Sequence, residues 1–177
     1  MNTYIAFLRG INVGGHNVKM EHLRELFTSL GFSNVRTYIQ SGNVFFDSDK
    51  DQKALEKDIA AMLETKLGYA VPTFVRTVAE LEKTLTEAPF ADIELTDDTR
   101  HMIVFISDPI PPTTTFPLRS PKGDYEIVGA TSGELYVVVH LINGKFVSSN
   151  FIEKTFNVAT TGRFFHTALK LLEAAKA

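Results

Sequence analysis

Two short polar segments carry the residues that could do chemistry. The first is the run Arg9 to Asn17, which holds Asn12 and the pair Gly14-Gly15 and leads to Lys19. The second is Gln40-Ser41-Gly42-Asn43. Glycines let a backbone approach a ligand closely, and a loop that leads into a helix presents N–H groups beside the positive end of the helix dipole. A phosphate or carboxylate would suit such a loop, with Arg9 and Lys19 supplying positive charge.

The elements around these segments alternate between strand and helix. Apolar residues at helical spacing predict helices from Met20 to Leu30 and from Leu55 to Leu67. Runs of β-branched and aromatic residues predict strands at Tyr4 to Leu8, Val35 to Gln40, Val44 to Asp47 and Thr73 to Arg76. This order is that of a ferredoxin-like βαββαβ plait. In such a plait the first strand ends at the same edge of the sheet as the hairpin turn, so we expect the two polar segments to converge.

The rest of the chain predicts a second, smaller α+β lobe with an antiparallel sheet. Strands are expected at Met102 to Ile106 and in a hairpin of Tyr125 to Val128 with Leu135 to Ile142. The proline-rich stretch Asp108 to Asp124 predicts an exposed loop, and Asn150 to Glu153 reads as a capping box that opens a short helix. Thr160 to Arg163 is expected at the start of the last helix. We therefore predict two α+β lobes, residues 1–77 and 78–177.

Composition excludes several classes of function. The 177 residues include no cysteine, which rules out disulfide scaffolds, thiolate metal sites and cysteine nucleophiles. The histidines lack metal-ligand spacing, so no metal or other cofactor is predicted. A net charge of -3 argues against general nucleic-acid binding. No apolar run approaches the roughly 20 residues of a membrane span, and the start lacks a basic signal region. We expect a cytoplasmic protein without a membrane partner.

The segments Tyr4 to Asn17 and Val35 to Val44 strongly resemble the bacterial family called domain of unknown function 1697. The likeness extends to Thr161-Gly162-Arg163-Phe164-Phe165-His166-Thr167, where Phe164, Phe165 and His166 stand in place of the family's Asn, Trp and Asn. The resemblance implies a two-lobed α+β fold with a ferredoxin-like first part and no established activity. It also implies one polar cleft formed by Arg9, Asn12, Gly14, Gly15, Gln40, Ser41, Asn43 and, from the second lobe, Arg163.

Three kinds of function stay open from the sequence. The leading hypothesis is a module that binds a small anionic ligand through Arg9, Asn12, Gly14, Gly15, Lys19, Gln40, Ser41, Asn43 and Arg163. The alternative is a module for protein interaction or self-association without a small-molecule site. Weaker alternatives are a hydrolytic enzyme, with Ser41 as nucleophile and His16 as base, and RNA binding through strand aromatics. The loop is neither a P-loop nor a dinucleotide fingerprint, so it does not predict a nucleotide.

Overall fold

The computed structural model describes residues 1–39 and 42–177 of the chain. It divides them into two compact units, Met1–Glu82 with Leu171–Ala177, and Lys83–Lys170. Both units mix helices with an antiparallel sheet, so the predicted two-lobe α+β class is confirmed. The division falls within α3 (Val78–Thr86) and α5 (Phe165–Lys176). The lobe bounds 1–77 and 78–177 stay a prediction from the sequence.

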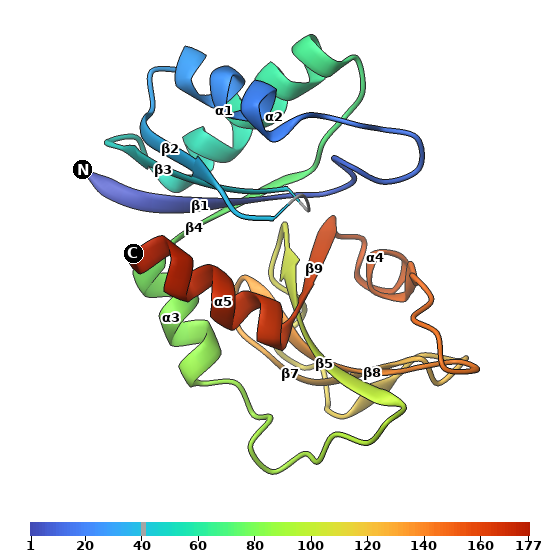
Figure 1. Ribbon diagram of the computed structural model, residues 1–177. Helices are drawn as coiled ribbons and strands as arrows, with labels where there is room; N and C mark the ends of the chain where they lie inside the picture. Colours follow the sequence, from blue (N-terminus) through green and yellow to red (C-terminus); the bar gives the residue numbers. More distant parts are fainter. Residues whose placement is uncertain (40–41) are drawn as a thin grey trace. The chain divides into compact units, whose positions relative to one another are not determined.

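The first unit follows the predicted alternation of elements. Its order is β1 (Asn2–Leu8), α1 (Met20–Ser29), β2 (Ser33–Thr37), β3 (Asn43–Ser48), α2 (Gln52–Leu67) and β4 (Thr73–Thr77). The strands pair antiparallel in the order β2-β3-β1-β4. Helices α1 and α2 lie side by side over one face of this sheet (Figure 1). The first polar segment named above is the β1–α1 loop. We call the described residues between β2 and β3, together with Asn43, the β2–β3 turn.

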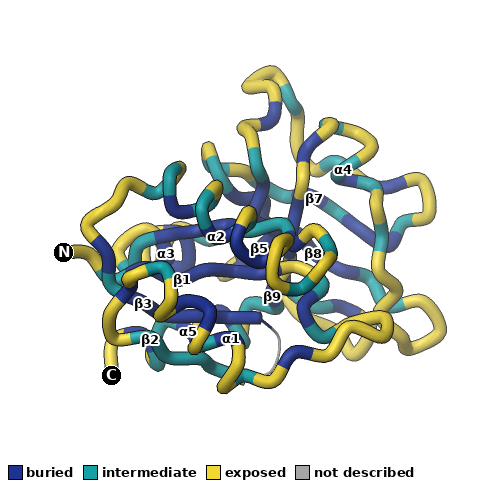
Figure 2. Tube along the Cα trace, turned by 90° about the horizontal axis from the view of Figure 1, so that it is seen from above, coloured by how far each residue is buried: buried dark blue, intermediate teal, exposed yellow. Residues whose placement is uncertain are grey.

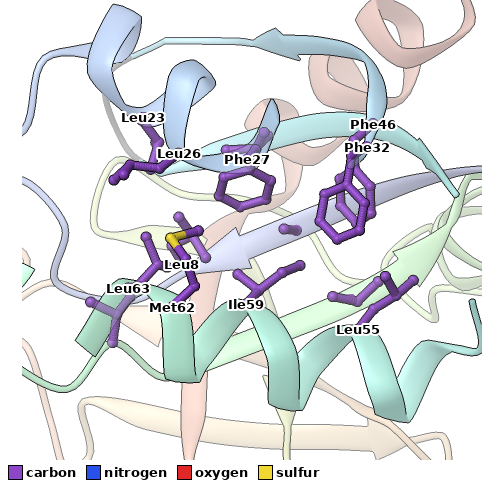
Figure 3. Packing of buried hydrophobic residues seen from close by; sticks show 14 of the residues in the cluster. Leu8, Leu23, Leu26, Phe27, Phe32, Phe46, Leu55, Ile59, Met62 and Leu63 are labelled. Carbon is purple, nitrogen blue, oxygen red and sulfur yellow. The ribbon is translucent and has the colours of Figure 1, made fainter. Parts of the chain in front are cut away.

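The core of the first unit lies between this sheet and its two helices (Figure 3). Side chains alternate along β1, so Tyr4, Ala6 and Leu8 share the face that packs against the helices. The helices contribute Leu23, Leu26 and Phe27 from α1 and Leu55, Ile59, Met62 and Leu63 from α2. Most of β1 and β3 is buried (Figure 2). This rigid sheet fixes where the β1–α1 loop and the β2–β3 turn begin and end.

The two helices of the first unit begin differently. Asp51 caps α2, because its carboxylate accepts hydrogen bonds from the backbone N–H groups of Lys53 and Ala54. Gly68, at a φ of 82°, ends α2. At α1 the N-cap residue is Lys19, whose side chain makes no capping bond. The N-cap residue of α1 therefore supplies no side-chain oxygen to the first-turn N–H groups.

The second unit holds β5 (Thr99–Ile106), β6 (Leu118–Arg119), β7 (Tyr125–Ala130), β8 (Glu134–His140), α4 (Phe151–Phe156) and β9 (Thr160–Phe164). Its strands pair antiparallel in the order β6-β7-β8-β5-β9. One face of the sheet buries an apolar cluster that includes Met102, Val104, Ile127 and Val137, with Ile152 from α4. Among the helices of the described residues, none combines the length and the apolar character that a membrane crossing requires.

One local prediction for the second unit is wrong, and two are right only in part. Thr160 to Arg163 does not start a helix but forms β9, which pairs with β5. The Asp108 to Asp124 stretch is not exposed throughout, because Ile110 and Ser120 are buried and β6 lies within it. The short helix expected after Asn150 is present as α4, with Asn150 as its N-cap residue, but the Asn150 side chain makes no capping bond. Glu153 accepts a hydrogen bond from the Thr160 hydroxyl.

Candidate functional site

The β1–α1 loop and the β2–β3 turn meet at one edge of the first unit's sheet. The backbone N–H of Leu8 donates to the Gly42 carbonyl across 2.8 Å. A Cβ atom at Gly42 would lie 2.8 Å from the Ile11 Cγ2 and 3.0 Å from the Leu8 carbonyl oxygen. Only glycine fits there, also because its φ is 82°. The convergence expected from the strand order is therefore present.

The β1–α1 loop is anchored at its ends and exposed in its middle. The N–H of Arg9 donates to the Pro72 carbonyl across 3.1 Å. At the other end the Asn12 Oδ1 accepts from the Val18 N–H across 2.7 Å, and Val18 is buried. Between these anchors residues 13–17 are exposed. We call residues 9–19, with Tyr38, Ile39, Gly42 and residues 69–72, the rim.

Four predicted site residues lie exposed on the rim, namely Arg9, Gly14, Gly15 and Lys19. Gly14 and Gly15 adopt φ values of 63° and 89°, so the tip of the loop needs residues without a Cβ atom. The rim therefore offers two cationic side chains and exposed backbone next to the start of α1.

The other predicted site residues are placed differently. Asn43 is 0% exposed, and its Nδ2 donates to the Tyr38 carbonyl across 3.3 Å. Arg163 belongs to the second unit, where it is 8% exposed and its Nη1 donates to the Thr161 hydroxyl and to the Gly162 carbonyl. Burial lowers the pKa of Arg163 to about 10. Gln40 and Ser41 lie outside the described residues.

Two features of the rim were not expected from the sequence. Tyr69, just after the end of α2, stacks on His16 with ring centroids 3.6 Å apart and ring planes 7° apart. Ile39 is exposed and has a φ of 49°. A β-branched residue is strained in this left-handed region, and such strain gathers at functional sites. An aromatic residue directly after a helix-ending glycine was the one sequence signal for Tyr69.

The charges and donors of the rim suit an anion better than a cation. Arg9 and Lys19 are basic side chains, and the positive end of the α1 dipole adds to their field. The first turn of α1 also carries one acidic side chain, that of Glu21. No group of three or more His, Asp and Glu side chains in the described chain could hold a metal ion.

The fold defines a two-unit α+β protein with a loop-and-turn rim on its first unit. The chain belongs to the family described as "Protein of unknown function (DUF1697)", whose model matches residues 1–136. That match includes the whole rim, whereas the likeness at Thr161 to Thr167 lies beyond the matched residues.

One solved structure supports the fold. It is described as "The structure of conserved bacterial protein SP0830 from Streptococcus pneumoniae", and it shares 20% sequence identity with this chain. The similarity covers 100% of this chain and 99% of that chain, with a TM-score of 0.71. At this identity the likeness concerns the fold alone. No curated protein matches the chain.

Proposed function

We propose that the protein binds a small anion, bearing a phosphate or a carboxylate, at the rim of its first unit. The observation that carries this proposal is the close approach of the turn to the loop, through the Leu8 to Gly42 hydrogen bond and the contact of Gly42 with Ile11. This approach holds the base of the loop in place, so its glycines and cations are positioned before a ligand arrives.

Each part of the rim has a role in this proposal. Arg9 and Lys19 attract the anion, and the guanidinium of Arg9 makes the charge-assisted hydrogen bonds. The exposed backbone at Gly14 and Gly15 donates N–H bonds, as in other glycine-bearing anion loops. Asn12 and Asn43 hold the loop and the turn through their bonds to Val18 and Tyr38. Gln40 and Ser41 stay in the proposed set of ligand-binding residues on the sequence prediction alone.

We also propose that the first unit is a ferredoxin-like plait, a narrower class than α+β. The strand order β2-β3-β1-β4, the antiparallel pairing and the two helices on one face support it. In this topology the first and second strands both end at the edge that carries the rim. A cytoplasmic location is also proposed, and cell fractionation would test it.

A ligand screen with matched variants tests the binding proposal. The full chain is screened by thermal shift against phosphate, sugar phosphates, nucleotides and carboxylates at constant ionic strength. A ligand at 100 times its dissociation constant should stabilise the protein by about 2.7 kcal/mol. Arg9→Ala should abolish the shift. Lys57→Ala, which removes an exposed cation from the N-terminal half of α2, should retain it. No hit in the screen, or hits that Arg9→Ala leaves unchanged, would refute the proposal.

Self-association of the protein is a second candidate. Its support is a group of exposed apolar side chains in one segment of the second unit, where Ile142, Phe146 and Val147 are 37%, 44% and 48% exposed. Light scattering at increasing protein concentration should then show a growing mass, and Phe146→Ser should abolish this growth. A constant monomer mass would remove this candidate.

A further inference from the structure

His16 is held at the rim by contacts with two different groups. Its ring lies 3.6 Å from the ring of Tyr69, nearly parallel to it, and its Nδ1 lies 3.3 Å from the Gly10 carbonyl oxygen. Tyr69 is itself packed against the core of the first unit. The imidazole therefore has a defined position although His16 is exposed.

The contact with Gly10 determines which ring nitrogen gains and loses the proton. A carbonyl oxygen only accepts hydrogen bonds, so Nδ1 must carry the hydrogen in this contact. In the neutral ring Nε2 then holds a lone pair, and in the charged ring it becomes a second donor. The bond to Gly10 is the same in both states. Protonation therefore changes Nε2 from acceptor to donor without a need to move the ring.

We infer that His16 makes anion binding at the rim dependent on pH, with Nε2 as a hydrogen-bond donor to the anion when the ring is charged. This inference rests on the function proposed above and adds a regulated contact to it. The charged ring joins Arg9 and Lys19 as a third cation on the same loop. Its stack on Tyr69 is compatible with the charge, because aromatic faces attract cations.

The groups around His16 carry both signs of charge. Its own loop carries Arg9 and Lys19, and the segment packed against its ring carries Tyr69. The adjoining helix turns carry Glu21 and His22 at the start of α1, and Glu64 and Lys66 at the end of α2. The other histidine among these groups is His22, whose Nδ1 lies 3.6 Å from the carboxylate of Glu25.

Sulfate is the suitable probe, because its charge stays constant between pH 5.5 and 8 whereas phosphate itself titrates. Amide shifts of the full chain are followed by NMR during sulfate titrations at constant ionic strength. Sulfate should bind about fivefold more tightly at pH 5.5 than at pH 8, the gain from making one hydrogen bond charge-assisted. In His16→Gln the affinity should be the same at both pH values and close to that of the wild type at pH 8.

His166→Gln is the matched control. His166 is also exposed, and it also lies parallel to an aromatic ring, that of Phe164 in the second unit. This variant should keep the pH dependence of the wild type, and so should His22→Gln. If wild-type affinity does not change with pH, or if His16→Gln retains the change, the inference on His16 is overturned while rim binding stands. If no rim amide responds to sulfate at any pH, the proposed function is overturned with it.

Discussion

Replacing Gly42 with alanine should destabilise the first unit more than any other single alanine substitution of its glycines. The new Cβ atom would lie 2.8 Å from the Ile11 Cγ2 and 3.0 Å from the Leu8 carbonyl oxygen. An alanine in the left-handed region costs about 1–2 kcal/mol, and overpacking a closed site costs about 1–3 kcal/mol. The free energy of unfolding of the first unit should therefore fall by about 2–5 kcal/mol.

Gly31→Ala separates the two contributions to this loss. Gly31 has a similar φ of 89°, but a Cβ atom there would meet nothing within 4 Å. Its replacement should cost about 1–2 kcal/mol, from backbone strain alone. Native-state hydrogen exchange of the strand amides measures both variants without assuming that the two units unfold together. Equal losses in the two variants would show that the turn does not pack against Ile11, and the reasoning about the rim would fail.

Two further substitutions test the packing of each unit. Arg36→Ala removes hydrogen bonds to α5, including one of 3.1 Å to the Ala174 carbonyl, and a guanidinium 5.2 Å from the Phe45 ring centroid. The amides in the last turn of α5 should exchange faster, and the free energy of unfolding of the first unit should fall by about 1–3 kcal/mol. Unchanged exchange in that turn would contradict the contact. In the second unit, burial lowers the pKa of His101 below 6.5, and its ring stacks on Phe90. Because the unfolded chain then binds the proton more readily, stability should fall as the pH drops below about 6.5. Urea unfolding measures the free energy of unfolding at pH 7.5 and at pH 5. Its fall between these pH values should be smaller in His101→Phe than in the wild type, and equal falls would refute the role of His101.

The elements predicted well are those with a clear hydrophobic period. Leu55, Ile59 and Leu63 recur every four residues, and α2 buries all three against its sheet. The strand β9 was missed because Thr160-Thr161-Gly162-Arg163 has no such period. Its conformation depends on pairing with β5, a partner more than 50 residues away in the chain. Gly162 fits this pairing, since a Cβ atom there would lie 2.9 Å from the Met102 sulfur.

The candidate site could be predicted only in part, for the same reason. The meeting of the loop and the turn follows from strand order, which the element order indicates. The burial of Asn43 does not follow, because its polar side chain suggested a ligand contact while its place inside the hairpin turns it toward the Tyr38 carbonyl. The stack of Tyr69 on His16 depends on where α2 ends relative to the loop. Such contacts are set by tertiary packing and leave no periodic signal.

A crystal soaked in selenate tests the central claim most directly, because selenate is a tetrahedral dianion whose selenium atom is located by its anomalous scattering. We predict a selenium peak at the rim of the first unit, within hydrogen-bond reach of the Gly14 and Gly15 backbone and of the Arg9 guanidinium, and no such peak in crystals of Arg9→Ala. Density confined to other surfaces, or a rim peak that persists in Arg9→Ala, would contradict the claim.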